Sequence, residues 1–256
     1  MKKILIFISC LLLITQSLIS KDLFNDVGIN LGFNTFRLVG DNPATEPIFV
    51  KRDNKLPHSG GGLNYIEPGV DLSATLFLDD NKIHRIIAGG EYISMNGKEA
   101  ASIENVGYKY AYHKVSFIDA YMGYHFSFYK APFQNVRIFA GLEFMFNNII
   151  LNELERGFKI LPGNESSHYA DSQYVEIYKK EPAFRIGGRI RVGFEGRIKK
   201  NIYITTSTTL GIYNLINRND ATKELFTIPR SLDTKESFQP FFNFLISFQY
   251  RFNDGR

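Results

Sequence analysis

The sequence predicts an all-β fold, an eight-stranded antiparallel up-and-down β-barrel that crosses a membrane. Three observations predict it. Long segments alternate apolar and polar residues with a period of two, the links between these segments alternate between short and long, and no segment after residue 20 is apolar over the length of a spanning helix. With 256 residues, 44% hydrophobic and 22% charged, the chain has the composition of one large ordered domain.

The N-terminus has the pattern of a secretory signal peptide. A pair of lysines precedes a nearly unbroken apolar run from Ile4 to Ile14, and small residues follow at Ser17 and Ser20. We expect residues 1–20 to be removed, with cleavage after Ser20 or after Ser17. The run is shorter than the ~20 apolar residues of a spanning helix.

Removal of this segment changes the net charge and the cysteine content of the chain. It takes away two lysines, so the formal net charge falls from +4 to +2, and this near balance argues against a nucleic-acid-binding protein. The sole cysteine, Cys10, lies within the removed segment. We therefore expect a mature chain without disulfides or thiolate chemistry.

The clearest alternating segment is FRIGGRIRVGFEGRI, residues 184–198. Its even positions hold every large apolar side chain, and its odd positions hold glycines and charges. A helix would spread these arginines over several faces, whereas a strand places them all on one face. Seven other segments alternate in a similar way, so we predict eight strands within about residues 27–252 of a barrel domain that spans 21–256: Val27–Phe33, Val70–Leu76, His84–Met95, Ile118–Phe128, Ile138–Phe146, Ile202–Ile212 and Phe242–Phe252.

The links between these segments indicate how the barrel is oriented. Short links at 79–82, 130–135 and 199–201 alternate with long links at about 41–62, 96–107, 147–182 and 217–236. An up-and-down membrane barrel has short periplasmic turns and long extracellular loops, and an even strand number places both termini at the periplasmic rim. Because function tends to lie on loops, we expect an extracellular ligand, where there is one, to bind through loops 41–62 and 147–182.

Periodicity alone leaves open which face of the barrel is outside. The strands are long, the apolar face stays aromatic and aliphatic to the last strand, and the polar face is rich in glycine. Small side chains suit the narrow interior of an eight-stranded barrel, so these features favour the apolar face toward lipid. The chain also has no tryptophan, and so lacks the Gly-x-Trp signature of the soluble lipocalin barrels.

The segment FFNFLISFQYRF, residues 241–252, resembles the last strand of bacterial outer-membrane barrels. The mature chain as a whole is similar in pattern and layout to the small eight-stranded outer-membrane barrels such as OmpX and the transmembrane domain of OmpA. This resemblance implies an outer-membrane location, with membrane lipids and the barrel-assembly machinery as partners, and Phe248, Tyr250 and Phe252 as the assembly signal. In that family the terminal aromatic is often the final residue, whereas residues 253–256 follow it here.

The polar face is expected to place a nearly balanced set of charges in the lumen. Because an unpaired buried charge costs several kcal/mol, our main expectation is a lattice of ion pairs that plugs the barrel. A narrow passive pore for small solutes, with a slight preference for anions, is the alternative. The six arginines and five acids of this predicted network are Asp71, Arg85, Glu91, Asp119, Arg137, Glu143, Arg185, Arg189, Arg191, Glu195 and Arg197.

One short motif raises a third possibility. The His-Phe-Ser sequence at 125–127, followed by Glu143 on the next strand, resembles the His-x-Ser pair and Glu of eight-stranded lipid A deacylases, which implies a nucleophile, a base and an acid. However, Phe128 and Tyr129 replace the asparagine and alanine of that family, and the motif is predicted to face the lumen near a short turn. We therefore predict a protein that is not an enzyme, with no cofactor and no metal site, that serves envelope structure or surface interaction.

Overall fold

The computed structural model describes residues 27–49, 60–103, 106–131, 136–161, 173–228 and 235–252. The predicted signal peptide and parts of all four predicted long links lie outside these residues. Within them, no helix has the length and apolar character needed to cross a membrane. The secondary structure is almost entirely strand: β1 (Val27–Leu38), β2 (Glu67–Phe77), β3 (His84–Ile103), β4 (Gly107–Lys130), β5 (Val136–Ile160), β6 (Tyr174–Lys179), β7 (Ala183–Lys199), β8 (Ile202–Ile216) and β9 (Pro240–Arg251), with one 3₁₀ turn, η3 (Asp220–Thr222).

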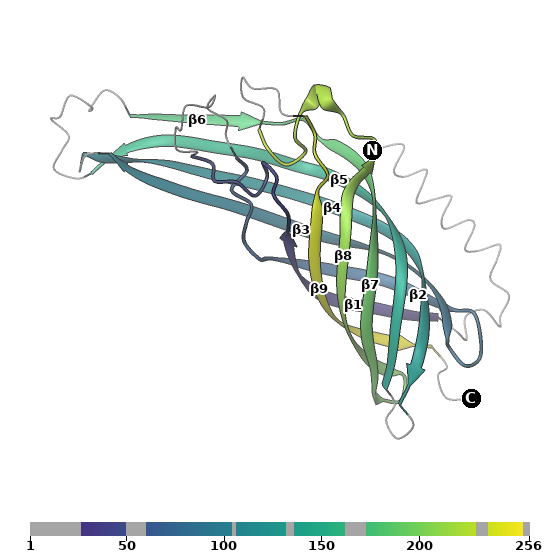
Figure 1. Cartoon of the computed structure of the whole chain (residues 1–256). Helices are drawn as coiled ribbons and strands as arrows, with labels where there is room; N and C mark the ends of the chain where they lie inside the picture. The colour runs from purple at the N-terminus through teal and green to yellow at the C-terminus, as the bar shows by residue number, and fades with distance from the viewer. Residues whose placement is uncertain are drawn as a thin grey trace.

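Eight of these strands close into a barrel (Figure 1). Each pairs antiparallel with the next, β5 pairs with β7, and the ring closes where β1 pairs with β9. The predicted fold class, an eight-stranded antiparallel barrel, is confirmed. The remaining strand, β6, lies outside the ring and pairs with the far end of β5.

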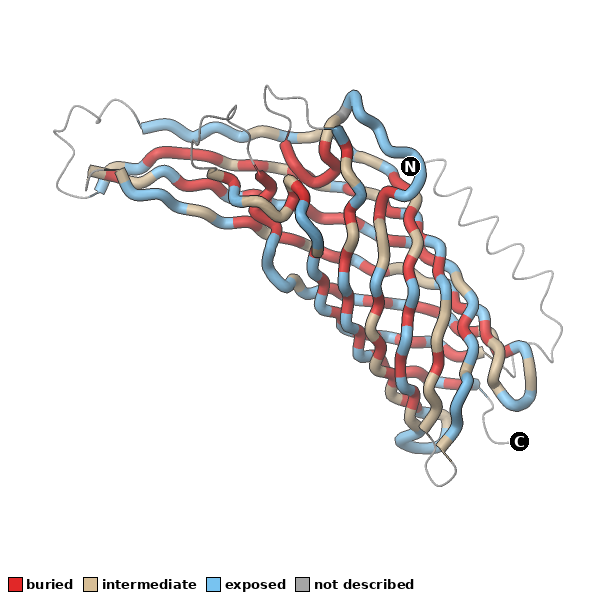
Figure 2. The backbone as a smooth tube through the Cα atoms, in the orientation of Figure 1, coloured by how far each residue is buried: buried red, intermediate tan, exposed pale blue. Residues whose placement is uncertain are grey.

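The wall of the barrel is apolar outside and polar inside. Exposure alternates residue by residue along the strands (Figure 2). On the outer face, Phe33 is 67% and Phe144 is 70% exposed, while Asn30 and Asn34 are buried on the inner face. This is the reverse of a water-soluble protein, in which large apolar patches are covered. The outer wall therefore suits lipid, and the barrel is of the transmembrane type.

Three strands are much longer than a membrane requires. The strands β3, β4 and β5 contain 20, 24 and 25 residues, against the ~9–11 that cross a bilayer. The ends of these strands that project beyond the ring form a sheet with β6, on the side opposite the short turns (Figure 1). We call this sheet the extended sheet. The predicted long links 96–107 and 147–182 are therefore wrong over most of their described length. Backbone hydrogen bonds hold these strands together whether or not their side chains are apolar.

The predicted short links at 79–82 and 199–201 are tight connections between neighbouring strands. Lys82 and Asn201 take left-handed backbone conformations there, with φ of 57° and 66°. Asn tolerates this conformation better than most residues, whereas Lys at such a position is uncommon. We call this end of the barrel the short-turn rim and the opposite end the mouth.

Candidate functional site

The lumen is filled by layers of polar side chains, and its middle layer centres on Glu143 of β5. This buried carboxylate accepts hydrogen bonds from Arg191 Nε at 2.6 Å and Arg191 Nη2 at 3.1 Å, and a further bond from Arg189 Nε. His125 Nε2 lies 2.8 Å from the same carboxylate. Because a carboxylate only accepts, His125 carries its proton on this nitrogen. Register explains the arrangement, since Arg189 of β7 is paired directly with Glu143.

A second carboxylate, Glu91 of β3, carries this layer across the barrel. Arg189 Nη1 donates to Glu91 Oε1. The other oxygen of Glu91 accepts from Asn34 Nδ2 at 2.5 Å and from Asn243 Nδ2 at 3.0 Å. Strands β1, β3, β5, β7 and β9 are thus joined through their side chains, and the network occupies the width of the lumen.

A lower layer lies nearer the short-turn rim and is built around Glu195 of β7. Arg85 Nη1 donates to this carboxylate, and Arg251 Nη2 forms an ion pair with it. The guanidinium carbon of Arg251 lies 3.6 Å from the centre of the Tyr203 ring, and that of Arg85 lies 4.1 Å from the centre of the Phe139 ring. Arg251 is absent from the predicted network, although its parity in the last strand would have placed it in the lumen.

The two luminal aspartates bond to neutral partners instead of arginines. Asp71 accepts from the hydroxyl of Tyr121 at 2.6 Å, and Asp119 accepts from Asn147 Nδ2 at 2.7 Å. The guanidinium carbon of Arg189 lies 4.2 Å from the centre of the Tyr121 ring. Asp71 is therefore connected to the middle layer through the ring of Tyr121.

Two predicted luminal arginines lie outside the lumen, and the prediction is wrong for them. Arg137 is only half-buried and donates to the carbonyls of Asn81 and Lys82, both at 2.8 Å, in the β2–β3 connection. Arg197 is exposed near the end of β7. Whether a position in a strand is odd or even gives the face to which its side chain points, but at the short-turn rim the wall no longer encloses a lumen.

Arg185 is buried at the mouth, where its partner comes from a long link. Its Nε and Nη2 atoms donate to the two oxygens of Glu236, each at 2.8 Å. Glu236 also accepts from Asn214 Nδ2 at 3.2 Å and from the Asn219 backbone at 2.7 Å. Burial raises the pKa of Glu236, but the bonds from Arg185 and its other donors outweigh burial and hold this pKa below its usual value. Sequence patterns contain no signal for this pairing, because residues in an irregular link have no period.

The mouth is closed by a turn at residues 224–228, which we call the mouth cap. Leu225 and Phe226 of this turn are buried inside the barrel. The Phe226 ring centre lies 5.9 Å from those of Phe117 and Tyr213. Rings from β1 and β9 complete an aromatic cluster, so the lumen changes from polar to apolar toward the mouth.

Polar tethers hold the mouth cap to the strands. Lys180 Nζ donates to the carbonyls of Glu224, Leu225 and Thr227, the last two at 3.4 and 3.2 Å. Burial lowers the pKa of Lys180 to about 8, although Glu224 opposes the shift. Asn152 Nδ2 donates to the same Leu225 carbonyl at 3.4 Å. The cap is therefore fixed by its backbone carbonyls as well as by its apolar side chains.

The residues of the deacylase-like motif do not form a catalytic set. Ser127 Oγ is buried and has no hydrogen-bond partner among the described residues. His125 donates from Nε2 to Glu143, but its other ring nitrogen, Nδ1, which a base would use, has no hydrogen-bond partner among the described residues. The imidazole stacks on Phe139 with ring centres 5.3 Å apart. All of these groups lie inside the barrel rather than on the lipid-facing wall. Among the described residues, no group of three or more His, Cys, Asp or Glu side chains is arranged to hold a metal.

Comparisons with known proteins find only distant similarities. No protein-family model and no curated protein matches the chain. Among solved structures, the chain is similar to Neisserial surface protein A (NspA), with 11% identity, a TM-score of 0.41, and coverage of 88% of this chain and 97% of that one. It is also similar to OprG from Pseudomonas aeruginosa, with 9% identity, a TM-score of 0.42, and coverage of 88% and 95%.

A third similar structure is Ail, the attachment invasion locus protein of Yersinia pestis, in complex with the heparin analogue sucrose octasulfate. It is 11% identical, with a TM-score of 0.40, and the match covers 89% of this chain and 98% of that one. The eight-stranded ring and its apolar outer wall themselves give the chain the fold of the small eight-stranded outer-membrane barrels. The resemblance predicted from the sequence is confirmed at the level of fold.

Proposed function

We propose that the chain is an exported outer-membrane protein that is not an enzyme, and that its closed barrel supports an extracellular sheet used for surface interaction. The observation that carries the proposal is the contrast between the closed lumen and the extended sheet. The lumen is filled by ion pairs and covered by the mouth cap, whereas the extended sheet is far longer than the membrane requires.

The filled lumen favours this role over that of a pore. Glu143 and Glu91 bridge the middle layer, Glu195 occupies the lower layer, and Phe226 covers the mouth. A solute would have to break buried ion pairs to pass, and breaking such a pair costs ~3–5 kcal/mol. We expect the refolded protein to show no steady single-channel conductance in a planar bilayer. Steady conductance that changes when Arg189 and Arg191 are substituted would favour the pore instead.

The extended sheet supplies a surface for a partner. The β4–β5 and β5–β6 registers place Tyr112, Glu155 and Ile177 in one row across three strands, and Val175 lies in the next row on the same face. Val175 is 60% exposed, and Tyr112 and Ile177 are also exposed. Exposed apolar side chains gathered on one face of a soluble part are typical of an interaction site. This surface replaces loop 147–182 as a whole as the proposed contact region. The described part of loop 41–62 packs on the opposite face of the sheet, where Ile48 N and Phe49 N donate to Glu99 of β3.

The surface role is tested by display on bacteria that lack other adhesins. We expect cells carrying the protein to bind epithelial cells or extracellular matrix, and the double substitution Tyr112→Ser with Ile177→Lys to abolish the gain. The control is Phe144→Leu on the lipid-facing wall, which should leave binding unchanged. Equal binding by the wild type and the double variant would remove the extended sheet from the proposal.

The location is tested separately by fractionation with a heat-modifiability gel. We expect the protein in the outer-membrane fraction, with a shift in mobility on heating, because a closed barrel resists detergent until it is heated. Recovery in the soluble periplasm without a shift would contradict the membrane assignment. The same preparation, analysed for lipid A mass with a His125→Ala control, tests the deacylase alternative.

A further inference from the structure

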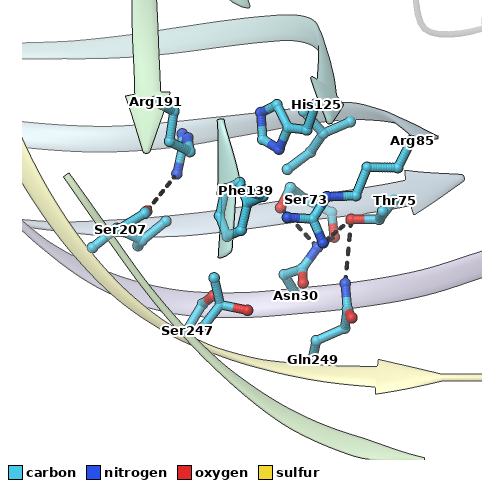
Figure 3. Close-up of a pocket in the computed structure, with 13 residues that line it drawn as sticks. Asn30, Ser73, Thr75, Arg85, His125, Phe139, Arg191, Ser207, Ser247 and Gln249 are labelled. Atoms are coloured by element: carbon cyan, nitrogen blue, oxygen red, sulfur yellow. Dashed lines mark hydrogen bonds between the residues drawn. The ribbon is translucent and has the colours of Figure 1, made fainter. Parts of the chain in front are cut away.

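A small cavity lined by buried residues lies in the lumen on the side of the short-turn rim. Its volume is about 20 Å³. Figure 3 shows its lining, in which Arg85, Arg191 and His125 from three strands lie beside a set of hydroxyl and amide side chains. The described lining residues include two guanidinium groups and no carboxylate. One water needs ~10–15 Å³ by this measure, so the cavity holds one or two particles of that size.

The charges beside this cavity are unbalanced. In the middle layer, Arg189 and Arg191 meet two carboxylates. In the lower layer, Arg85 and Arg251 share the single carboxylate of Glu195. The aromatic rings beside these two arginines relieve part of the cost, but they carry no net charge. Within the lower layer, one positive charge therefore has no carboxylate of its own, and a buried charge without a full counter-charge is destabilising. The remaining luminal acids, Asp71 and Asp119, bond to Tyr121 and Asn147 instead.

Hydrogen-bond donors are available in the same place. Arg85 is 4% exposed, and its Nε atom is buried with no hydrogen-bond partner among the described residues. Thr75 Oγ1 already accepts from Asn30 Nδ2 at 3.0 Å and from Gln249 Nε2 at 3.3 Å, so its own hydrogen is free to donate. Gln249 is held in this orientation because its carbonyl oxygen accepts from Arg251 Nε at 2.5 Å.

We propose that this cavity is a binding site for a small inorganic anion of the size of chloride. The anion balances the arginine excess of the lower layer and accepts the hydrogen bonds that Arg85 Nε and the Thr75 hydroxyl offer. The volume suits a monatomic anion and excludes bulky oxyanions such as phosphate. The site lies in the closed part of the barrel and does not depend on the proposed surface role.

The experiment measures the unfolding equilibrium of refolded full-length protein in detergent while chloride replaces gluconate at constant ionic strength. Above the dissociation constant, a tenfold rise in chloride should lower the unfolding equilibrium constant about tenfold, because the anion binds only the folded state. Equal stability in chloride and gluconate would overturn the proposal and leave the cavity to water.

Two substitutions move the charge excess in opposite directions. Arg85→Gln leaves Arg251 paired one-to-one with Glu195, so the chloride dependence should be lost. Glu195→Gln enlarges the excess, so the dependence should persist or grow. Lys114→Gln, at an exposed position of the extended sheet, is the charge-matched control and should behave as the wild type. The same chloride response in the Arg85 variant as in the wild type would place the anion elsewhere and overturn the proposal.

A direct measurement does not depend on whether these variants fold. Crystals of the wild-type protein grown in bromide should give an anomalous peak in the cavity, within hydrogen-bond distance of Arg85 Nε. A bromide-containing crystal without a peak there would overturn the proposal.

Discussion

Removing the carboxylate of Glu143 should be among the most damaging single changes in the barrel. Glu143→Ala removes three hydrogen bonds from arginine and the contact with His125. Arg189 keeps Glu91, but Arg191 is left with a bond of 3.4 Å to Ser207. Removing one partner of a buried ion pair costs ~3–5 kcal/mol, and we expect the free energy of unfolding to fall by about that amount.

The measurement is urea unfolding of the refolded barrel in detergent, followed by the loss of β-structure. The matched control is Glu153→Ala, which breaks a largely exposed pair with Lys179 at 3.1 Å and should cost less than about 1 kcal/mol. The double variant Glu143→Ala with Arg191→Ala should recover part of the loss, because it removes the stranded charge as well. If Glu143→Ala cost no more than Glu153→Ala, the luminal network would not be a source of stability and the reasoning would be refuted.

Three other predictions concern space, pH and the mouth cap. A Cβ at Gly141 would lie 2.0 Å from the imidazole of His125, so Gly141→Ala should lower the free energy of unfolding by ~1–3 kcal/mol in the same urea assay. Gly196→Ala is the control and should lower it little, because the nearest atom to a Cβ there is 3.8 Å away. Because burial lowers the pKa of Lys180 to about 8 from 10.5, the unfolded chain binds more protons between these pH values, so the free energy of unfolding should rise from pH 8 to 10.5, and Lys180→Met should remove that rise. Phe226→Ala removes a buried ring and should lower the free energy of unfolding by ~3–5 kcal/mol. If the mouth cap opens independently of the ring, the substitution should instead speed amide exchange at residues 224–228 without changing global stability. If neither the free energy of unfolding nor the exchange rate changed, the cap would be contradicted.

Much of the wall could be predicted from the sequence because its period is fixed by geometry. Successive side chains of a strand point to opposite faces, so the odd positions of residues 184–198 had to share one face once the segment was a strand. Arg189 and Arg191 lie in the lumen for this reason. The same argument applied to Arg137 and Arg197 failed, because parity contains no information about where the enclosing wall ends.

Other features depend on contacts between residues far apart in the chain. The extensions of β3, β4 and β5 are stabilised by backbone pairing, which leaves only a weak pattern in side chains such as Lys109 and Lys114. The bond between Arg185 and Glu236 joins a strand to a link, 51 positions apart. The burial of Phe226 is likewise set by the aromatic cluster that receives it.

The mouth and the rest of the lumen are closed by different kinds of contact. The stability of the ring therefore depends little on the sequence of the links at the surface. Near the short-turn rim and in the middle, charged side chains are fixed by strand register, so that Arg189 and Glu143 face each other wherever the β5–β7 pairing holds. At the mouth, closure depends on Phe226 and on Lys180 holding backbone carbonyls, whose chemistry is the same for every residue type. Positions of the mouth links other than Phe226 and Glu236 can therefore change in sequence while the ring stays intact, and the extended sheet stands on the same side of the barrel as these links.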